Sequence, residues 1–201
     1  MPINHEIIFA GRSNVGKSSL IKKLTGKSVK IGRRPGVTRR PAHILCKDLL
    51  ITDMPGYGFL HGVPDDVQER IKDLIVHYIE DNSDRILCAV QVIDASSFCE
   101  IVDRWYKKGE LPVDIELFEF LSDINVDTII AANKMDLITD RDHTLDQIVK
   151  RFDLLPPWKQ WLDVIAPVSA KKGDVSSIVT LLRGRLHGIG RDNLLGCARM
   201  A

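Results

Sequence analysis

The sequence predicts an α/β protein with one mostly parallel, six-stranded sheet, an antiparallel edge strand and helices on both faces. Apolar strand-like runs alternate with amphipathic helix-like stretches, which is typical of parallel sheets whose strands are joined by helices. A phosphate-binding loop pattern stands between the first run and the first amphipathic stretch. The chain has 201 residues, enough for one domain with a sizeable core.

Each element follows from the spacing of apolar residues along the chain. Strand-like runs occupy residues 5–10, 41–47, 48–53, 86–93, 127–132 and 163–168. Helix-like stretches occupy residues 17–25, 65–81, 98–108, 113–123, 142–152 and 175–187. Gly109 and Pro112 interrupt the helical region 98–123, so we expect two helices there. The second and third strands are too close for a crossover, so we expect an antiparallel hairpin near Lys47 and parallel strands elsewhere.

Composition narrows the setting of the protein. The four cysteines show no metal-binding spacing, and Cys46 and Cys88 fall in strand-like runs, which predicts reduced core residues and a cytoplasmic protein. We expect no signal peptide and no membrane span, because no apolar run is long enough.

Positive charge is concentrated in the first quarter of the chain. Residues 1–47 hold eleven Lys and Arg but one acid, Glu6, whereas the remainder holds seventeen Lys and Arg and twenty-six acids. The excess is densest in the acid-free stretch 22–40, at Lys22, Lys23, Lys27, Lys30, Arg33, Arg34, Arg39 and Arg40. Two interpretations stay open, a solvated surface or a face that contacts RNA phosphates.

Residues 11–18 match the phosphate-binding loop G-x-x-x-x-G-K-[ST]. Glycines at both ends allow successive N–H groups to point at one anion. Lys17 would reach the β- and γ-phosphates, and Ser18 would offer its hydroxyl to magnesium at the start of a helix. The predicted phosphate-binding residues are Gly11, Arg12, Ser13, Asn14, Val15, Gly16, Lys17, Ser18 and Ser19.

A second motif follows the hairpin strand and reads Asp53, Met54, Pro55, Gly56. An Asp that ends a strand beside a phosphate loop is placed to hold magnesium, often through a water. The amide of Gly56 could sense the γ-phosphate. By itself D-x-x-G also suits an ordinary turn.

Two later motifs select the base. The first comprises Asn133, Lys134, Met135 and Asp136, and the second comprises Val168, Ser169, Ala170 and Lys171. The Asp136 carboxylate could accept from N1–H and the 2-amino group of guanine together, a donor pair that adenine lacks. Asn133 could tie base and loop together, the stem of Lys134 could lie over the base, and the Ala170 N–H could donate to the 6-oxo group. A solvated turn at 133–136 is the alternative.

These motifs, in this order, resemble the translation-factor-related GTPases. The run D-M-P-G-Y-G-F from Asp53 to Phe59 is similar to the second switch of the EngB/YihA family, and residues 100–112 look like its archaeal branch. The resemblance reaches about Gly188, so we expect a GTPase domain over 1–188 and a partly disordered tail over 189–201. It implies that Pro35, Gly36, Val37, Thr38 and Arg39 form the first switch.

The resemblance also carries functional expectations. Thr38 would complete the magnesium shell of Ser18 and Asp53. The protein would hydrolyse GTP to GDP, assist assembly of the large ribosomal subunit, and be needed for normal cell division and septation. We expect a monomer that contacts a ribosomal particle or rRNA through the basic first-switch region, and no membrane.

The catalytic machinery predicted in this way comprises Lys17, Thr38, Gly56 and Asn14. Tyr57 stands where Ras-like GTPases carry the glutamine that orients water, so we expect slow intrinsic hydrolysis. In related GTPases an Asn at the position of Asn14 helps to hold potassium; the alternative is that Asn14 only tolerates a tight turn. Two other functions are weighed: a nucleotide-gated scaffold with negligible hydrolysis, and a P-loop kinase for a small molecule.

Overall fold

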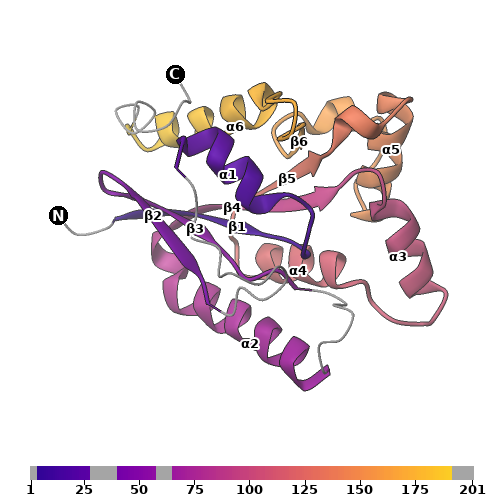
Figure 1. Ribbon diagram of the computed structural model, residues 1–201, viewed down its shortest axis with the longest axis horizontal. Helices are drawn as coiled ribbons and strands as arrows, with labels where there is room; N and C mark the ends of the chain where they lie inside the picture. The colour runs from indigo at the N-terminus through magenta and orange to yellow at the C-terminus, as the bar shows by residue number, and fades with distance from the viewer. Residues whose placement is uncertain (1–3, 28–39, 58–64, 192–201) are drawn as a thin grey trace.

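The computed structural model describes residues 4–27, 40–57 and 65–191 and contains the predicted six-stranded sheet. The strands lie in the order β2-β3-β1-β4-β5-β6 (Figure 1). They are β1 (His5–Ala10), β2 (Ala42–Cys46), β3 (Leu49–Asp53), β4 (Ile86–Asp94), β5 (Thr128–Asn133) and β6 (Ile165–Pro167). Edge strand β2 runs antiparallel to β3 and every other pair is parallel, which confirms the predicted fold class and hairpin.

Helices cover both faces of the sheet (Figure 1). They are α1 (Lys17–Thr25), α2 (Asp65–Asn82), α3 (Phe98–Tyr106), α4 (Val113–Asp123), α5 (Arg141–Arg151) and α6 (Ser176–Gly188). Helices α1 and α6 pack on one face, while α2, α3, α4 and α5 pack on the other. Short 3₁₀ helices occupy Ser83–Arg85, Met135–Leu137 and Trp158–Trp161.

Neighbouring residues of the central strands enter different cores. In β1, Ile7 and Phe9 join the core beneath α1 and α6, whereas Ile8 and Ala10 join the core beneath α2 and α4. Because both faces are covered, these strands read as continuous apolar runs rather than as an alternation.

Two predicted boundaries need correction. The strand expected over 163–168 is confined to Ile165–Pro167, because the Val164 N–H donates to the Trp161 carbonyl (3.0 Å) and closes the preceding 3₁₀ turn. The helix expected over 98–108 ends at Tyr106. The N–H groups of Lys108 and Gly109 donate to carbonyls three residues back, and the chain turns at Gly109, where φ is 74°. The predicted interruption between α3 and α4 is confirmed.

A buried carboxylate in the central strand β1 ties several elements together. Glu6 of β1 is fully buried and accepts from Arg85 Nε (2.7 Å), from the Tyr78 hydroxyl (2.6 Å) and from Thr52 Oγ1. It therefore links β1 to β3, α2 and the turn that begins β4, and its charge is fully hydrogen-bonded as buried charges require.

Two further expectations can be compared with the structure. Cys46 and Cys88 are buried, as predicted, and burial raises the pKa of Cys88 to about 12. Within the described ranges, no helix is both long and apolar enough to cross a lipid bilayer.

Candidate nucleotide-binding site

The sequence motifs meet at the carboxyl ends of the parallel strands. The phosphate loop leaves β1, Asp53 ends β3, Asn133 ends β5, and Ser169 follows β6. Adjacent strand ends of an open α/β sheet form the usual ligand crevice.

Two glycines of the phosphate loop are required by close packing. A Cβ on Gly11, where φ is 146°, would meet the Val92 carbonyl oxygen at 2.2 Å. A Cβ on Gly16, where φ is 99°, would meet the Asn133 side-chain nitrogen at 2.3 Å. The glycine pattern therefore reflects contact with β4 and with the base motif, in addition to the freedom of the backbone.

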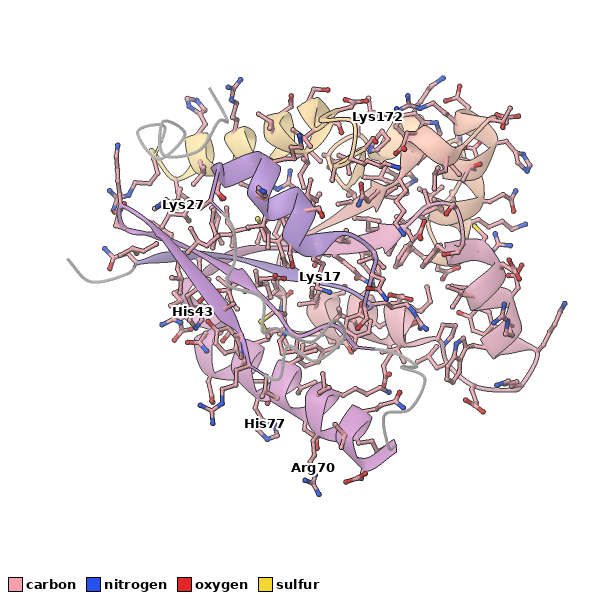
Figure 2. The ribbon with its side chains drawn as sticks, viewed as in Figure 1. Lys17, Lys27, His43, Arg70, His77 and Lys172 are labelled. Atoms are coloured by element: carbon pink, nitrogen blue, oxygen red, sulfur yellow. The ribbon has the colours of Figure 1, made fainter. Side chains whose placement is uncertain are left out.

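Lys17 is held inside its own loop. Its Nζ donates to the carbonyl oxygens of Gly11 (2.8 Å) and Arg12 (3.0 Å), and the residue is 7% exposed. Burial lowers the pKa of Lys17 to about 8, although the charges of Asp53 and Asp114 act in the opposite direction. Figure 2 shows Lys17 where the loop enters α1.

Ser18 and Asp53, both predicted magnesium ligands, lie in direct contact. The Ser18 hydroxyl donates to Asp53 Oδ2 (2.6 Å), while Asp53 Oδ1 is buried and has no hydrogen-bond partner within the described residues. Burial raises the pKa of Asp53, and the bond from Ser18 and the charge of Lys17 oppose that rise. A buried carboxylate oxygen without a donor suits a hard cation.

Asn133 joins three motifs through one side chain. Its amide donates to the Val15 carbonyl of the phosphate loop (2.8 Å), and its Oδ1 accepts from the Ala170 N–H (3.0 Å). The residue is 3% exposed, so these bonds are shielded from water. The Ala170 N–H, expected to donate to guanine, donates to Asn133 in this structure.

The base motif is oriented by two further contacts. The Ser169 hydroxyl donates to Asp136 Oδ1, and this bond is the main cause that lowers the pKa of Asp136. Asp136 is exposed and is therefore an ionised acceptor. Lys134 Nζ donates to Asp94 Oδ2 (2.6 Å), which directs the lysine stem. Asp94 belongs to none of the sequence motifs, and only its position at the end of strand β4 marks it in the sequence.

A cavity of about 850 Å³ connects the phosphate loop with the base motif. It is lined by Asn14, Gly16, Ser19, Lys22, Lys23, Gly26, Asn133, Lys134, Asp136, Leu137, Ala170 and Lys171. Polar and cationic side chains surround a carboxylate there, which suits a ligand with an anionic part and a donor-rich base.

Several predicted site residues turn their side chains away from this cavity. Those of Val15, Met54, Met135 and Val168 are buried in the hydrophobic cores, and Pro55 is buried as well. They can therefore contact a nucleotide only through the backbone.

Arg12 and Asn14 differ in exposure within the phosphate loop: Arg12 is half-buried and Asn14 is exposed. Both residues line a second cavity of about 110 Å³, with Asp114 on its wall. Asn14 is exposed and has φ 67°, a left-handed conformation that Asn tolerates better than most residues. The turn interpretation of Asn14 is therefore compatible with its backbone.

The second switch begins against the phosphate loop. The Ser13 N–H donates to the Tyr57 carbonyl (3.1 Å), and a Cβ on Gly56 would meet Ser13 Oγ at 2.6 Å. Tyr57 itself is 3% exposed. The predicted first switch, Pro35, Gly36, Val37, Thr38 and Arg39, lies outside the described residues.

Comparison with known proteins agrees with this arrangement. A family model described as "50S ribosome-binding GTPase" matches residues 6–134. A probable GTP-binding protein EngB from Methanosarcina mazei is 56% identical over 194 residues, covering 96% of this chain and 93% of that protein. Its homologue from Methanosarcina barkeri is 54% identical with the same coverage.

A solved structure extends the comparison to three dimensions. The crystal structure of a probable GTP-binding protein engB has a TM-score of 0.80 and 46% identity, covering 93% of this chain and 99% of that one. The chain belongs to the EngB family of GTP-binding proteins, in its archaeal branch, and is a GTPase.

Proposed function

We propose that this GTPase is a magnesium-dependent switch that reads guanine through Asp136 and reports the γ-phosphate through Gly56. The bridge made by Asn133 carries the proposal. One buried amide binds the phosphate loop and the loop at Ala170 together, so phosphate and base subsites have a fixed spacing. Ser169 holds the Asp136 carboxylate beside that bridge.

Magnesium fits the residues that are present. The Ser18 hydroxyl would hold it together with Asp53 Oδ1, which has no hydrogen-bond partner among the described residues, and Thr38 would be a further ligand. When bound, it would neutralise charge that develops on the phosphates. Lys17 contributes a second positive charge from the same loop.

We also propose that the switch assists assembly of the large ribosomal subunit and is thereby needed for normal cell division and septation. The description of the matching family model, a 50S ribosome-binding GTPase, supports the ribosome as the partner. The positive charge on the surface agrees with binding to ribosomal RNA. Lys22, Lys23 and Lys171 are exposed near the nucleotide cavity, and Figure 2 shows Lys27 and Lys172 on the side of α1 and α6. We place the protein in the cytoplasm as a monomer, with 1–188 as its GTPase domain and 189–201 as a tail.

Ribosomal particles should bind the protein more tightly with a non-hydrolysable GTP analogue than with GDP. Binding to RNA phosphates releases counterions, so the affinity should fall steeply as salt rises. Co-sedimentation at several salt concentrations measures both effects, and sequencing the captured RNA identifies the contact. Equal binding with both nucleotides, insensitive to salt, would contradict the ribosomal role.

The expected slow hydrolysis keeps a nucleotide-gated scaffold as the second candidate function. The residue after Gly56 is a buried tyrosine whose hydroxyl donates to Asp114 (3.1 Å), so it does not supply the amide that orients water in Ras-like proteins. A nucleotide-gated scaffold needs binding and release more than rapid turnover.

Potassium chloride should accelerate GTP hydrolysis on the order of 10-fold over sodium chloride, because a cation beside the phosphates stabilises developing charge. Steady-state phosphate release in the two salts measures the effect. Asn14→Gly keeps the left-handed turn and removes the amide, so it should abolish the difference between the salts. If wild-type rates are equal in both salts, Asn14 serves the turn alone.

A further inference from the structure

A buried carboxylate beneath the phosphate loop touches both the loop and the second switch. Asp114 lies in the first turn of α4 and is 1% exposed. Its Oδ1 accepts from the Tyr57 hydroxyl (3.1 Å), and its Oδ2 lies 3.9 Å from Nη1 of Arg12. Gln91 of β4 holds its backbone, donating from Nε2 to the Asp114 carbonyl (2.5 Å).

This arrangement is costly as a purely structural device. Asp114 Oδ2 and Arg12 Nη1 are both buried without a hydrogen-bond partner in the described part of the chain. Burial raises the pKa of Asp114 to about 6, opposed by Arg12, Tyr57 and Lys17, so the group is mostly ionised at neutral pH. A buried ion pair that leaves polar atoms unpaired is often less stable than apolar side chains of the same size. In contrast, both carboxylate oxygens of Glu6 accept hydrogen bonds.

The contacts of Tyr57 connect Asp114 to the γ-phosphate sensor. Its carbonyl accepts from the Ser13 N–H, and the preceding Gly56 packs so closely on Ser13 that a Cβ would lie 3.0 Å from the Ser13 Cα. The Tyr57 side chain points away from that contact, into the core beside α4. Fixing both ends of Tyr57 therefore fixes where the Gly56 N–H can lie.

We propose that Asp114 is a positioning residue for recognition of the γ-phosphate: by holding Tyr57 and Arg12, it keeps Gly56 against the phosphate loop. The inference rests on the proposed role of Gly56. It assigns to α4, an element outside every nucleotide-binding motif, a part in distinguishing GTP from GDP. Loss of the contacts of Asp114 with Tyr57 and Arg12 should weaken the contacts that the protein makes only with a triphosphate. The contacts that it makes with both GTP and GDP should be unaffected.

Two conservative variants test this positioning. Tyr57→Phe removes only the hydroxyl, and Asp114→Asn removes the charge that faces Arg12. Each should lower the affinity for a non-hydrolysable GTP analogue about 10-fold, the scale of one hydrogen bond to a charged group, and that for GDP less than about 2-fold. The double variant should lower the affinity for the analogue by less than the product of the two single effects, because both contacts act on the position of Gly56. Titration calorimetry with both nucleotides measures these ratios.

Tyr78→Phe is the matched control. It removes another tyrosine-to-carboxylate bond, to Glu6 of β1, which belongs to none of the nucleotide-binding motifs. It should lower the melting temperature to a similar degree and leave the ratio of the two affinities unchanged.

Gly56→Ala separates this inference from the proposed function. If Gly56→Ala does not lower the affinity for the GTP analogue more than the affinity for GDP, the proposed role of Gly56 as the γ-phosphate sensor fails. Alternatively, Gly56→Ala lowers the affinity for the analogue selectively while Tyr57→Phe and Asp114→Asn change the affinities for the analogue and for GDP equally, or change neither. That result overturns the positioning role of Asp114.

Discussion

Asp136→Asn should lower the affinity for GTP about 100-fold, the scale expected when two charge-assisted hydrogen bonds are lost. The carboxylate is exposed, its pKa is lowered mainly by the bond from Ser169, and it is therefore a pure acceptor. An amide in its place presents N–H groups to the donors N1–H and 2-amino of guanine. The same amide would donate to the 2-oxo group of xanthine, so the affinity for xanthosine triphosphate should rise by a similar factor.

Competition between labelled GTP and each triphosphate measures this exchange of specificity. Asp140→Asn is the control, because it makes the same chemical change four residues later. Asp140 caps α5 by accepting from the His143 N–H (3.1 Å), and Asn caps helices equally well. The control should bind GTP as the wild type does. Unchanged GTP binding in Asp136→Asn would remove Asp136 from base recognition.

The sheet and the meeting of motifs were accessible from sequence because their signals are local. Strands β1, β3, β4 and β5 are five to nine residues long and largely apolar, and the first three motifs lie at the ends of β1, β3 and β5. Since parallel strands end at one edge, chain order was enough to predict a shared site.

Contacts between distant side chains were not accessible in this way. Nothing near Tyr57 in the chain indicates that its hydroxyl lies on Asp114, fifty-seven residues away. The pair of Lys134 with Asp94 likewise depends on the register of β4 with β5. Such polar pairs are set by packing after the elements form, and residue type alone predicts only that each needs a partner.

The boundaries that differed have a different origin, in local hydrogen bonds at the ends of elements. The 3₁₀ turn at Trp158–Trp161 shortened β6, and its residues read as an ordinary loop between two apolar runs. Local hydrogen bonds at helix and strand ends compete closely with continuation of the element.

Gly16→Ala should lower nucleotide affinity at least about 100-fold, because it displaces the amide that joins the phosphate and base subsites. The new Cβ would lie 2.3 Å from Asn133 Nδ2 at a backbone φ of 99°. Asn133 must then give up its bonds to Val15 and Ala170, and both motifs lose their fixed spacing. With the strain of a left-handed alanine added, stability should fall by about 3 kcal/mol.

Gly109→Ala provides the matched control. Its φ is 74°, and nothing lies within 4 Å of the added Cβ, so only backbone strain is introduced. We expect the free energy of unfolding of this variant to fall by about 1 kcal/mol and its nucleotide affinity to equal that of the wild type. In thermal unfolding, the melting temperature should fall by about 10 °C for Gly16→Ala and about 3 °C for Gly109→Ala. If both variants bound GTP like the wild type, the Asn133 bridge would be dispensable, and the fixed spacing of the two subsites would have to come from elsewhere in the sheet.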